Sequence, residues 1–135
     1  MSEAVVHLID DDEAVRKSLA FLLTAAQLNV RTHESAVAFL KVLPKVGRGC
    51  IITDMHMPQV DGIELIRRLR DHGCNLPVIV ITGVGDLRHA VEAIKAGAID
   101  FLEKPICAEM LLAWIRSAFV CGGWSRGLES DATFI

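Results

Sequence analysis

Short apolar runs alternate with amphipathic stretches along the whole chain. The runs are rich in β-branched residues and predict five strands, at 5–9, 29–33, 50–53, 77–82 and 99–102. After each run, apolar residues recur at helical spacing and predict helices within 15–26, 36–43, 63–69, 87–94 and 111–118. Three of the strands are apolar without a break, which is typical of parallel strands buried on both faces. The alternation therefore predicts an α/β fold, a doubly wound parallel sheet with helices on both faces.

Residues that favour helix ends stand at the borders of these segments. The predicted N-caps are Asp12, Ser35, Asp61 and Asp86. Gly73 and Gly97 lie where the third and fourth helices should stop. The positions of these helix-end residues agree with five pairs of a strand followed by a helix.

Polar side chains gather where the predicted strands end. Asp10 and Asp11 follow the first strand and Asp54 follows the third. Thr82 ends the fourth strand and Lys104 follows the fifth. In such a sheet the ligand site lies beyond the carboxyl ends of the strands, so we expect these side chains to meet there.

The types of residue at this edge indicate a particular chemistry. Adjacent carboxylates repel each other unless a hard cation lies among them, and Mg²⁺ prefers such oxygen ligands. An Asp carboxylate beside that metal can attack phosphorus and form an acyl phosphate. Lys104 can pair with a carboxylate and then with phosphate oxygens, and Thr82 can donate a hydrogen bond to the same group.

Each of these residues has a simpler explanation when taken alone. An Asp at a strand end is most often a cap or a turn residue, and a single Lys is usually a solvated charge. The convergence of four strands on one edge is what favours a site. The side chains of the five histidines show no ligand spacing, so we expect none of these imidazoles to bind metal. The G-x-G of residues 83–85 lacks the rest of a dinucleotide fingerprint.

Composition and charge narrow the remaining classes. A length of 135 residues predicts one domain, and a formal charge of −3 gives no electrostatic footprint for nucleic acid. The four cysteines are far apart and the N-terminus has no signal-peptide pattern, which favours the cytoplasm. The longest charge-free stretch, 18–30, is too short to span a bilayer, so no membrane association is expected.

Four motifs resemble a known family, the receiver domains of two-component response regulators. They are "LIDDDEAVRKSL", "TDMHMPQVDGIEL", "VIVITGVGD" and "AGAIDFLEKP", in the family's order and spacing. The resemblance covers about residues 5–120, and the sequences of the motifs are most similar to the FixJ-like subgroup. It implies a flavodoxin-like (βα)5 fold with strand order 2-1-3-4-5. It also implies a receiver domain over 1–121. Gly122, Gly123 and Gly127 then break the helical periodicity, which predicts a flexible tail over 122–135.

The resemblance assigns a role to each motif residue. Asp54 would be the phosphoacceptor, and Mg²⁺ would be bound by Asp10, Asp11, Asp54 and the backbone carbonyl of His56. Thr82 would be the switch hydroxyl, Phe101 the switch aromatic and Lys104 the phosphate-binding ammonium. Lys104-Pro105 would be a cis peptide. The chain would then be a signalling module, phosphorylated by a sensor histidine kinase or a histidine phosphotransfer protein rather than acting as an enzyme.

Two alternatives stay open at this point. Asp10-x-Asp12 with the later Thr82 and Lys104 also resembles haloacid-dehalogenase-type phosphatases, although that family's further acidic pair is missing and Asp54 would have no task. FixJ-like regulators usually continue into a DNA-binding domain, so the chain could be a receiver fragment of such a regulator. Otherwise it acts through a downstream protein partner. A phosphorylation-dependent homodimer is left open, because Ile106 stands where the subgroup usually has Phe.

Overall fold

Five strands and five helices alternate in the computed structural model, which describes residues 4–43 and 47–119. The strands are β1 (Val5–Ile9), β2 (Val30–His33), β3 (Gly49–Asp54), β4 (Val78–Thr82) and β5 (Asp100–Glu103). The helices are α1 (Glu13–Ala25), α2 (Ala36–Lys41), α3 (Gly62–Asp71), α4 (Leu87–Ala96) and α5 (Ala108–Ala118). The predicted tail, 122–135, lies outside the described residues.

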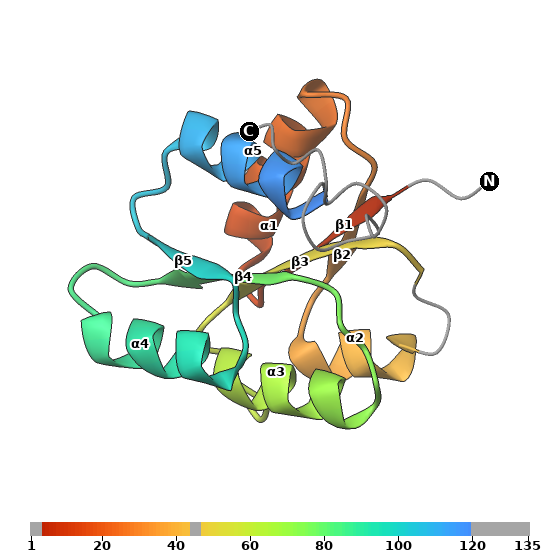
Figure 1. Ribbon diagram of the computed structural model, residues 1–135. Coiled ribbons are helices and arrows are strands. Elements are labelled where there is room, and N and C mark those ends of the chain that lie inside the picture. Colours follow the sequence, from red (N-terminus) through yellow and green to blue (C-terminus); the bar gives the residue numbers. More distant parts are fainter. Residues whose placement is uncertain (1–3, 44–46, 120–135) are drawn as a thin grey trace.

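All strand pairs are parallel, and the sheet has the order β2-β1-β3-β4-β5. The flavodoxin-like α/β prediction is therefore confirmed. Helices α1 and α5 cover one face, and α2, α3 and α4 cover the other (Figure 1). The order reverses between β1 and β3, so the carboxyl ends of these two central strands form the topological switch point.

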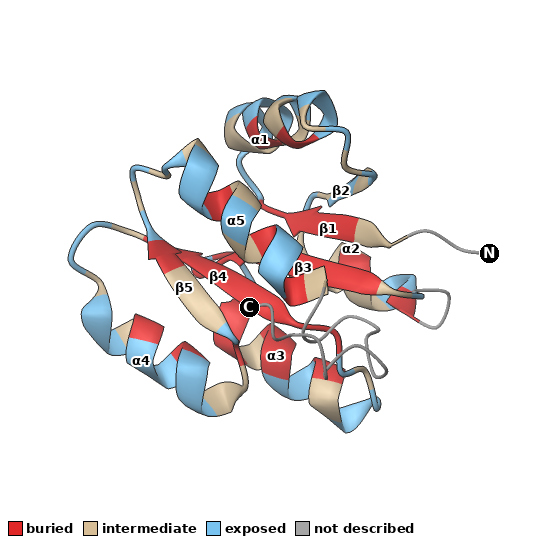
Figure 2. Ribbon diagram, turned by 45° about the horizontal axis from the view of Figure 1, so that its top comes forward, coloured by how far each residue is buried: buried red, intermediate tan, exposed pale blue. Residues whose placement is uncertain are grey.

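The strand sequences bury side chains on both faces in alternation. Ile51 belongs to the core beneath α2, α3 and α4, whereas its neighbour Ile52 packs in the core beneath α1 and α5. Every residue of β3 is buried, as an uninterrupted apolar run predicts (Figure 2). Burying one such isoleucine contributes about 1.5–3 kcal/mol. The two cores thus fix the sheet rigidly beneath its carboxyl edge.

Three of the four predicted helix N-caps are confirmed. Asp12 accepts hydrogen bonds from the first-turn amides of α1, Ser35 from one in α2 and Asp61 from one in α3. The prediction for Asp86 is right about its position, because this residue immediately precedes α4. It is wrong about the capping contact, because the Asp86 carboxylate makes no hydrogen bond to the first turn of α4. The carboxylate is instead held by two histidines, described below. Gly97 ends α4 with a φ of 125°, which a residue with a Cβ rarely adopts.

The chain turns back sharply after β3. The Gly62 amide donates to the Met55 carbonyl at 2.8 Å, and a Cβ on Gly62 would lie only 3.1 Å from the Asp54 carbonyl oxygen. Glycine therefore permits the start of α3 to approach the end of β3. Directly after β5, the Lys104-Pro105 peptide is cis, as the resemblance implied. Within the described residues, no helix is long and apolar enough to cross a membrane.

Candidate functional site

The three predicted acidic residues do converge at the carboxyl edge. Asp10 follows β1, Asp11 comes next, and Asp54 is the last residue of β3. One carboxylate oxygen of each lies within 4.8 Å of the others. Asp10 and Asp54 are buried, whereas Asp11 is exposed. The cluster is thus buried on the sheet side and open to solvent through Asp11.

Asp10 is placed by its backbone as well as by its side chain. Its carbonyl accepts from Arg16 Nη1 at 2.7 Å, and its Oδ1 accepts from the Asp12 amide at 2.9 Å. Its other carboxylate oxygen, Oδ2, is buried and has no hydrogen-bond partner among the described residues. A buried acceptor without a donor is costly, so this oxygen fits a ligand atom for a cation.

Burial raises the pKa of both buried carboxyl groups. For Asp10 the nearby Asp54 charge adds to this effect, while the Asp12 amide opposes it. For Asp54 the ammonium of Lys104 opposes the rise. Lys104 Nζ lies 3.3 Å from Asp54 Oδ1. The site therefore concentrates negative charge that one lysine balances only in part.

The remaining predicted residues come from β4 and β5. The Thr82 hydroxyl donates a long hydrogen bond of 3.5 Å to the Leu102 carbonyl, and the Lys104 amide donates to the Thr82 carbonyl at 2.9 Å. Phe101, on β5, is half-buried against the core under α2, α3 and α4. Because the Thr82 hydrogen bond is long, little energy holds its hydroxyl in this orientation.

Mg²⁺ fits the donor set of this site. Asp10, Asp11 and Asp54 offer only oxygen atoms, and one of these is a buried acceptor to which no described residue donates. The role of the His56 carbonyl stays a prediction.

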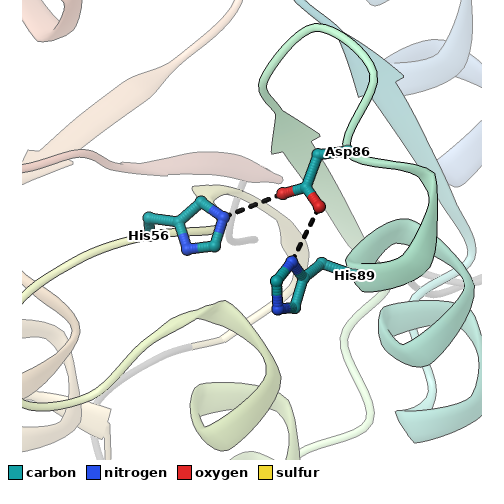
Figure 3. A group of neighbouring side chains, drawn as sticks. All are labelled: His56, Asp86 and His89. Carbon is teal, nitrogen blue, oxygen red and sulfur yellow. Dashed lines mark hydrogen bonds and ion pairs between the residues drawn. The ribbon is translucent and has the colours of Figure 1, made fainter.

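A second polar group at the same edge was missed from the sequence. The side chains of His56, Asp86 and His89 meet one another (Figure 3), and His56 follows Asp54 of the acidic cluster by two residues. Asp86 and His89 are one helical turn apart, which is a weak signal, but His56 lies 30 residues away from Asp86. Only the fold brings it there.

Fold and site together define a flavodoxin-like domain with an acidic site, compatible with magnesium, at the switch point of its sheet. Residues 6–116 match the family model for the response regulator receiver domain. The chain belongs to this family, and it is therefore a receiver module of two-component signalling.

Its relatives place it in the FixJ-like subgroup. The chain is 50% identical over 118 residues to the transcriptional regulatory protein FixJ of Rhizobium meliloti, covering 87% of this chain and 58% of that protein. It superposes on the crystal structure of FixJ-N with a TM-score of 0.85 and 49% identity, covering 90% of this chain and 97% of that one.

Full-length FixJ from B. japonicum matches with a TM-score of 0.84 and 42% identity, over 98% of this chain and 63% of that one. The chain thus spans about three fifths of the length of these longer relatives.

Proposed function

We propose that the chain accepts a phosphoryl group on Asp54 in a reaction that requires Mg²⁺. The observation that carries this proposal is the arrangement around Asp54. Its carboxylate lies at the end of β3, 3.3 Å from the Lys104 ammonium and beside Asp10, whose Oδ2 has no donor in residues 4–43 and 47–119. The donor would be the phosphohistidine of a sensor kinase or of a histidine phosphotransfer protein.

The acidic residues would hold the metal. Asp10 and Asp11 supply carboxylate oxygens, with Asp54 and the carbonyl of His56 completing the protein's share. When bound, Mg²⁺ would neutralise charge on the phosphoryl oxygens. Lys104 contributes the second positive charge, since its ammonium already lies against Asp54.

The reaction needs no proton from the protein. A carboxylate oxygen of Asp54 attacks phosphorus, and the bond from phosphorus to the donor's histidine nitrogen breaks. The product is an acyl phosphate, whose added oxygens the Lys104 ammonium and the Thr82 hydroxyl can reach as hydrogen-bond donors. The chain acts here as a phosphoacceptor, not as an enzyme that releases a product from a separate substrate.

Thr82 and Phe101 would convert this reaction into a conformational change. When the Thr82 hydroxyl leaves the Leu102 carbonyl for the phosphoryl group, it vacates space that the half-buried ring of Phe101 can fill. Moving such an equilibrium from 1:99 to 99:1 takes about 5.5 kcal/mol of differential interaction. A few charge-assisted hydrogen bonds supply energies of this order.

The surface that would respond carries several exposed apolar residues. Around α4 and the start of β5, the large hydrophobic residues exposed by 40% or more are Val84, Leu87, Val91, Ile94 and Ile99. This supports an output through protein contact, either with a downstream partner or with a second copy of the chain after phosphorylation. Since FixJ is named a transcriptional regulator, DNA contact is proposed for an effector domain and not for this one. We propose that the protein acts in the cytoplasm. We also propose that its receiver domain extends over residues 1–121.

The phosphatase alternative is less well supported. It needs Asp12 as a free general acid, but the Asp12 carboxylate accepts hydrogen bonds from the amides of Ala14 and Val15. It also leaves Asp54 and its contact with Lys104 without a purpose. The receiver chemistry uses both.

Intact mass spectrometry after incubation with acetyl phosphate tests the proposal. We expect one phosphoryl adduct in the presence of Mg²⁺, none with a chelator, and none in Asp54→Asn. The matched control is Asp61→Asn, which alters a helix cap outside the acidic cluster and should still be labelled. An adduct that persists in Asp54→Asn and vanishes in Asp10→Asn would favour the phosphatase alternative and contradict the proposal.

A further inference from the structure

His56, Asp86 and His89 form a compact group next to the acidic cluster. His56 Nε2 lies 2.8 Å from Asp86 Oδ2, and His89 Nδ1 lies 2.7 Å from Asp86 Oδ1. The two rings are nearly perpendicular, with centroids 5.0 Å apart. Figure 3 shows both imidazoles turned toward the one carboxylate, His56 from the loop after β3 and His89 from the first turn of α4.

The carboxylate of Asp86 is diverted from the position that its sequence favours. Asp86 immediately precedes α4, where an Asp side chain normally accepts from a first-turn amide. Here that bond is absent and both carboxylate oxygens face imidazole nitrogens. The carboxylate is therefore aimed at the two rings.

The donor set selects a different metal from that of the acidic cluster. Two imidazole nitrogens and one carboxylate are ligands for first-row transition metals such as Zn²⁺, whereas Mg²⁺ prefers oxygen alone. One ligand atom from each of the three residues lies within 4.8 Å of the others. Ligands of a tetrahedral zinc ion are about 3.3 Å apart. The two hydrogen-bonded pairs, now 2.8 and 2.7 Å apart, would open by about 0.5 Å to reach that spacing.

The group is also accessible to an ion. The side chains of His56 and His89 are 59% and 43% exposed, while Asp86 beneath them is 20% exposed. An ion entering from solvent would meet both rings first and the carboxylate below. Three protein ligands would leave a fourth position for water.

We propose that His56, Asp86 and His89 form a binding site for a divalent transition-metal ion, with Zn²⁺ as its natural occupant. The ion would join two segments that flank the phosphoacceptor. His56 lies two residues after Asp54, and Asp86 lies four residues after Thr82. Bound metal would therefore hold the β3–α3 loop against the start of α4. This site depends on the three side chains and not on the phosphorylation of Asp54.

Zinc titration by calorimetry tests the site directly. The full chain is titrated with Zn²⁺ in an excess of Mg²⁺, which competes for the acidic cluster. We expect one saturable zinc ion per chain, and imidazole NMR signals of His56 and His89 that shift together. Slower amide hydrogen exchange over residues 83–89 should accompany binding, because the loop is then fastened at two points.

Three variants make the assignment specific. Both His89→Ala and Asp86→Asn should weaken zinc binding at least tenfold, since even the loss of a residue supporting a metal ligand costs about 10–100-fold. The control His72→Ala removes another exposed histidine, one that contacts the Arg68 carbonyl at the end of α3. It should bind zinc as the native chain does. Circular dichroism verifies that each variant is folded.

Two results would overturn the proposal. One is an absence of saturable zinc binding below millimolar concentration in the native chain. The other is binding that survives in folded His89→Ala and Asp86→Asn but is lost in Asp10→Asn, because the ion would then occupy the acidic cluster. In either case the three side chains form only a hydrogen-bonded contact between the loop and α4.

Discussion

The polar groups at the two ends of the sheet differ in whether they have hydrogen-bond partners. At the amino end of β4, the Arg70 guanidinium donates to three carbonyls, those of Cys74, Leu76 and Gly97, at 2.8, 3.1 and 3.1 Å. One side chain thereby joins α3 to the segment before β4 and to the turn before β5. At the carboxyl end, three carboxylates cluster, and Asp10 Oδ2 has no donor in the part of the chain that the structure describes.

The difference separates stability from function. The contacts of Arg70 satisfy partly buried backbone acceptors and connect segments distant in sequence, so they stabilise the fold. The acidic cluster brings like charges together in a partly buried place, so it costs stability in the absence of a cation. We therefore expect substitutions at the two ends to change the free energy of unfolding in opposite directions.

The largest expected effect is at the Arg70 end. Arg70→Met leaves three carbonyls without their donor and should lower the free energy of unfolding by about 2–4 kcal/mol. Urea denaturation measures this value. Arg67→Met is the matched control, because Arg67 is exposed and its ion pair with Glu64 is long, at 3.9 Å. This variant should change the free energy of unfolding by less than about 0.5 kcal/mol. Equal effects in the two variants would contradict a structural role for Arg70.

A second effect comes from the histidine pair between β1 and β2. His7 Nδ1 lies 3.1 Å from His33 Nε2 and packs beside Phe39. Burial, aided by the charges of His33 and Arg31, lowers the pKa of His7 from 6.5 to about 4. The unfolded chain thus binds a proton at a pH where the folded chain does not.

Stability should therefore fall as the pH drops from 6.5 toward 4. Between pH 7 and pH 5 the expected loss from His7 is about 2 kcal/mol. His7→Leu should reduce this slope, and the remainder belongs to His33, whose pKa burial also lowers. His72→Leu should keep the full slope. Denaturation midpoints across this pH range measure the difference, and an unchanged slope in His7→Leu would show that other groups cause it.

The smallest expected effect is a gain at the acidic end. Without metal at pH 7, Asp10→Asn should raise the free energy of unfolding by about 1 kcal/mol. The raised pKa of Asp10 means that its penalty is absent below the ordinary value of 3.8 and grows as the pH rises through the folded pKa. The exposed Asp11→Asn should gain less.

Added Mg²⁺ sharpens this last test. It should stabilise the native chain by binding the folded state and should stabilise Asp10→Asn less. If Mg²⁺ raised the melting temperatures of the native chain and Asp10→Asn equally, Asp10 would not be one of its ligands.

The sequence predicted the sheet because its signals are local. The structure shifts the predicted bounds of each strand by at most one residue, and the caps at Asp12, Ser35 and Asp61 act over three residues. The acidic cluster could be predicted for a similar reason. Parallel strands bring their carboxyl ends to one edge, so the positions of Asp10 and Asp54 in their strands determine their meeting.

Contacts between distant segments could not be read in this way. The cap prediction failed at Asp86 because His56, 30 residues earlier, competes for its carboxylate. The role of Arg70 was equally hidden, since its partners are backbone carbonyls, which have no sequence signature. Both depend on loop geometry that periodicity does not encode.

The central claim is that a phosphoryl group at the carboxyl edge changes the surface at α4. Backbone NMR of the native chain with Mg²⁺ and beryllofluoride, a stable phosphoryl mimic, measures this most directly. The account predicts shift changes at Asp54, Thr82 and Phe101 that continue along α4, with Arg70 and its carbonyl partners unchanged. Changes confined to the residues around Asp54 would contradict it.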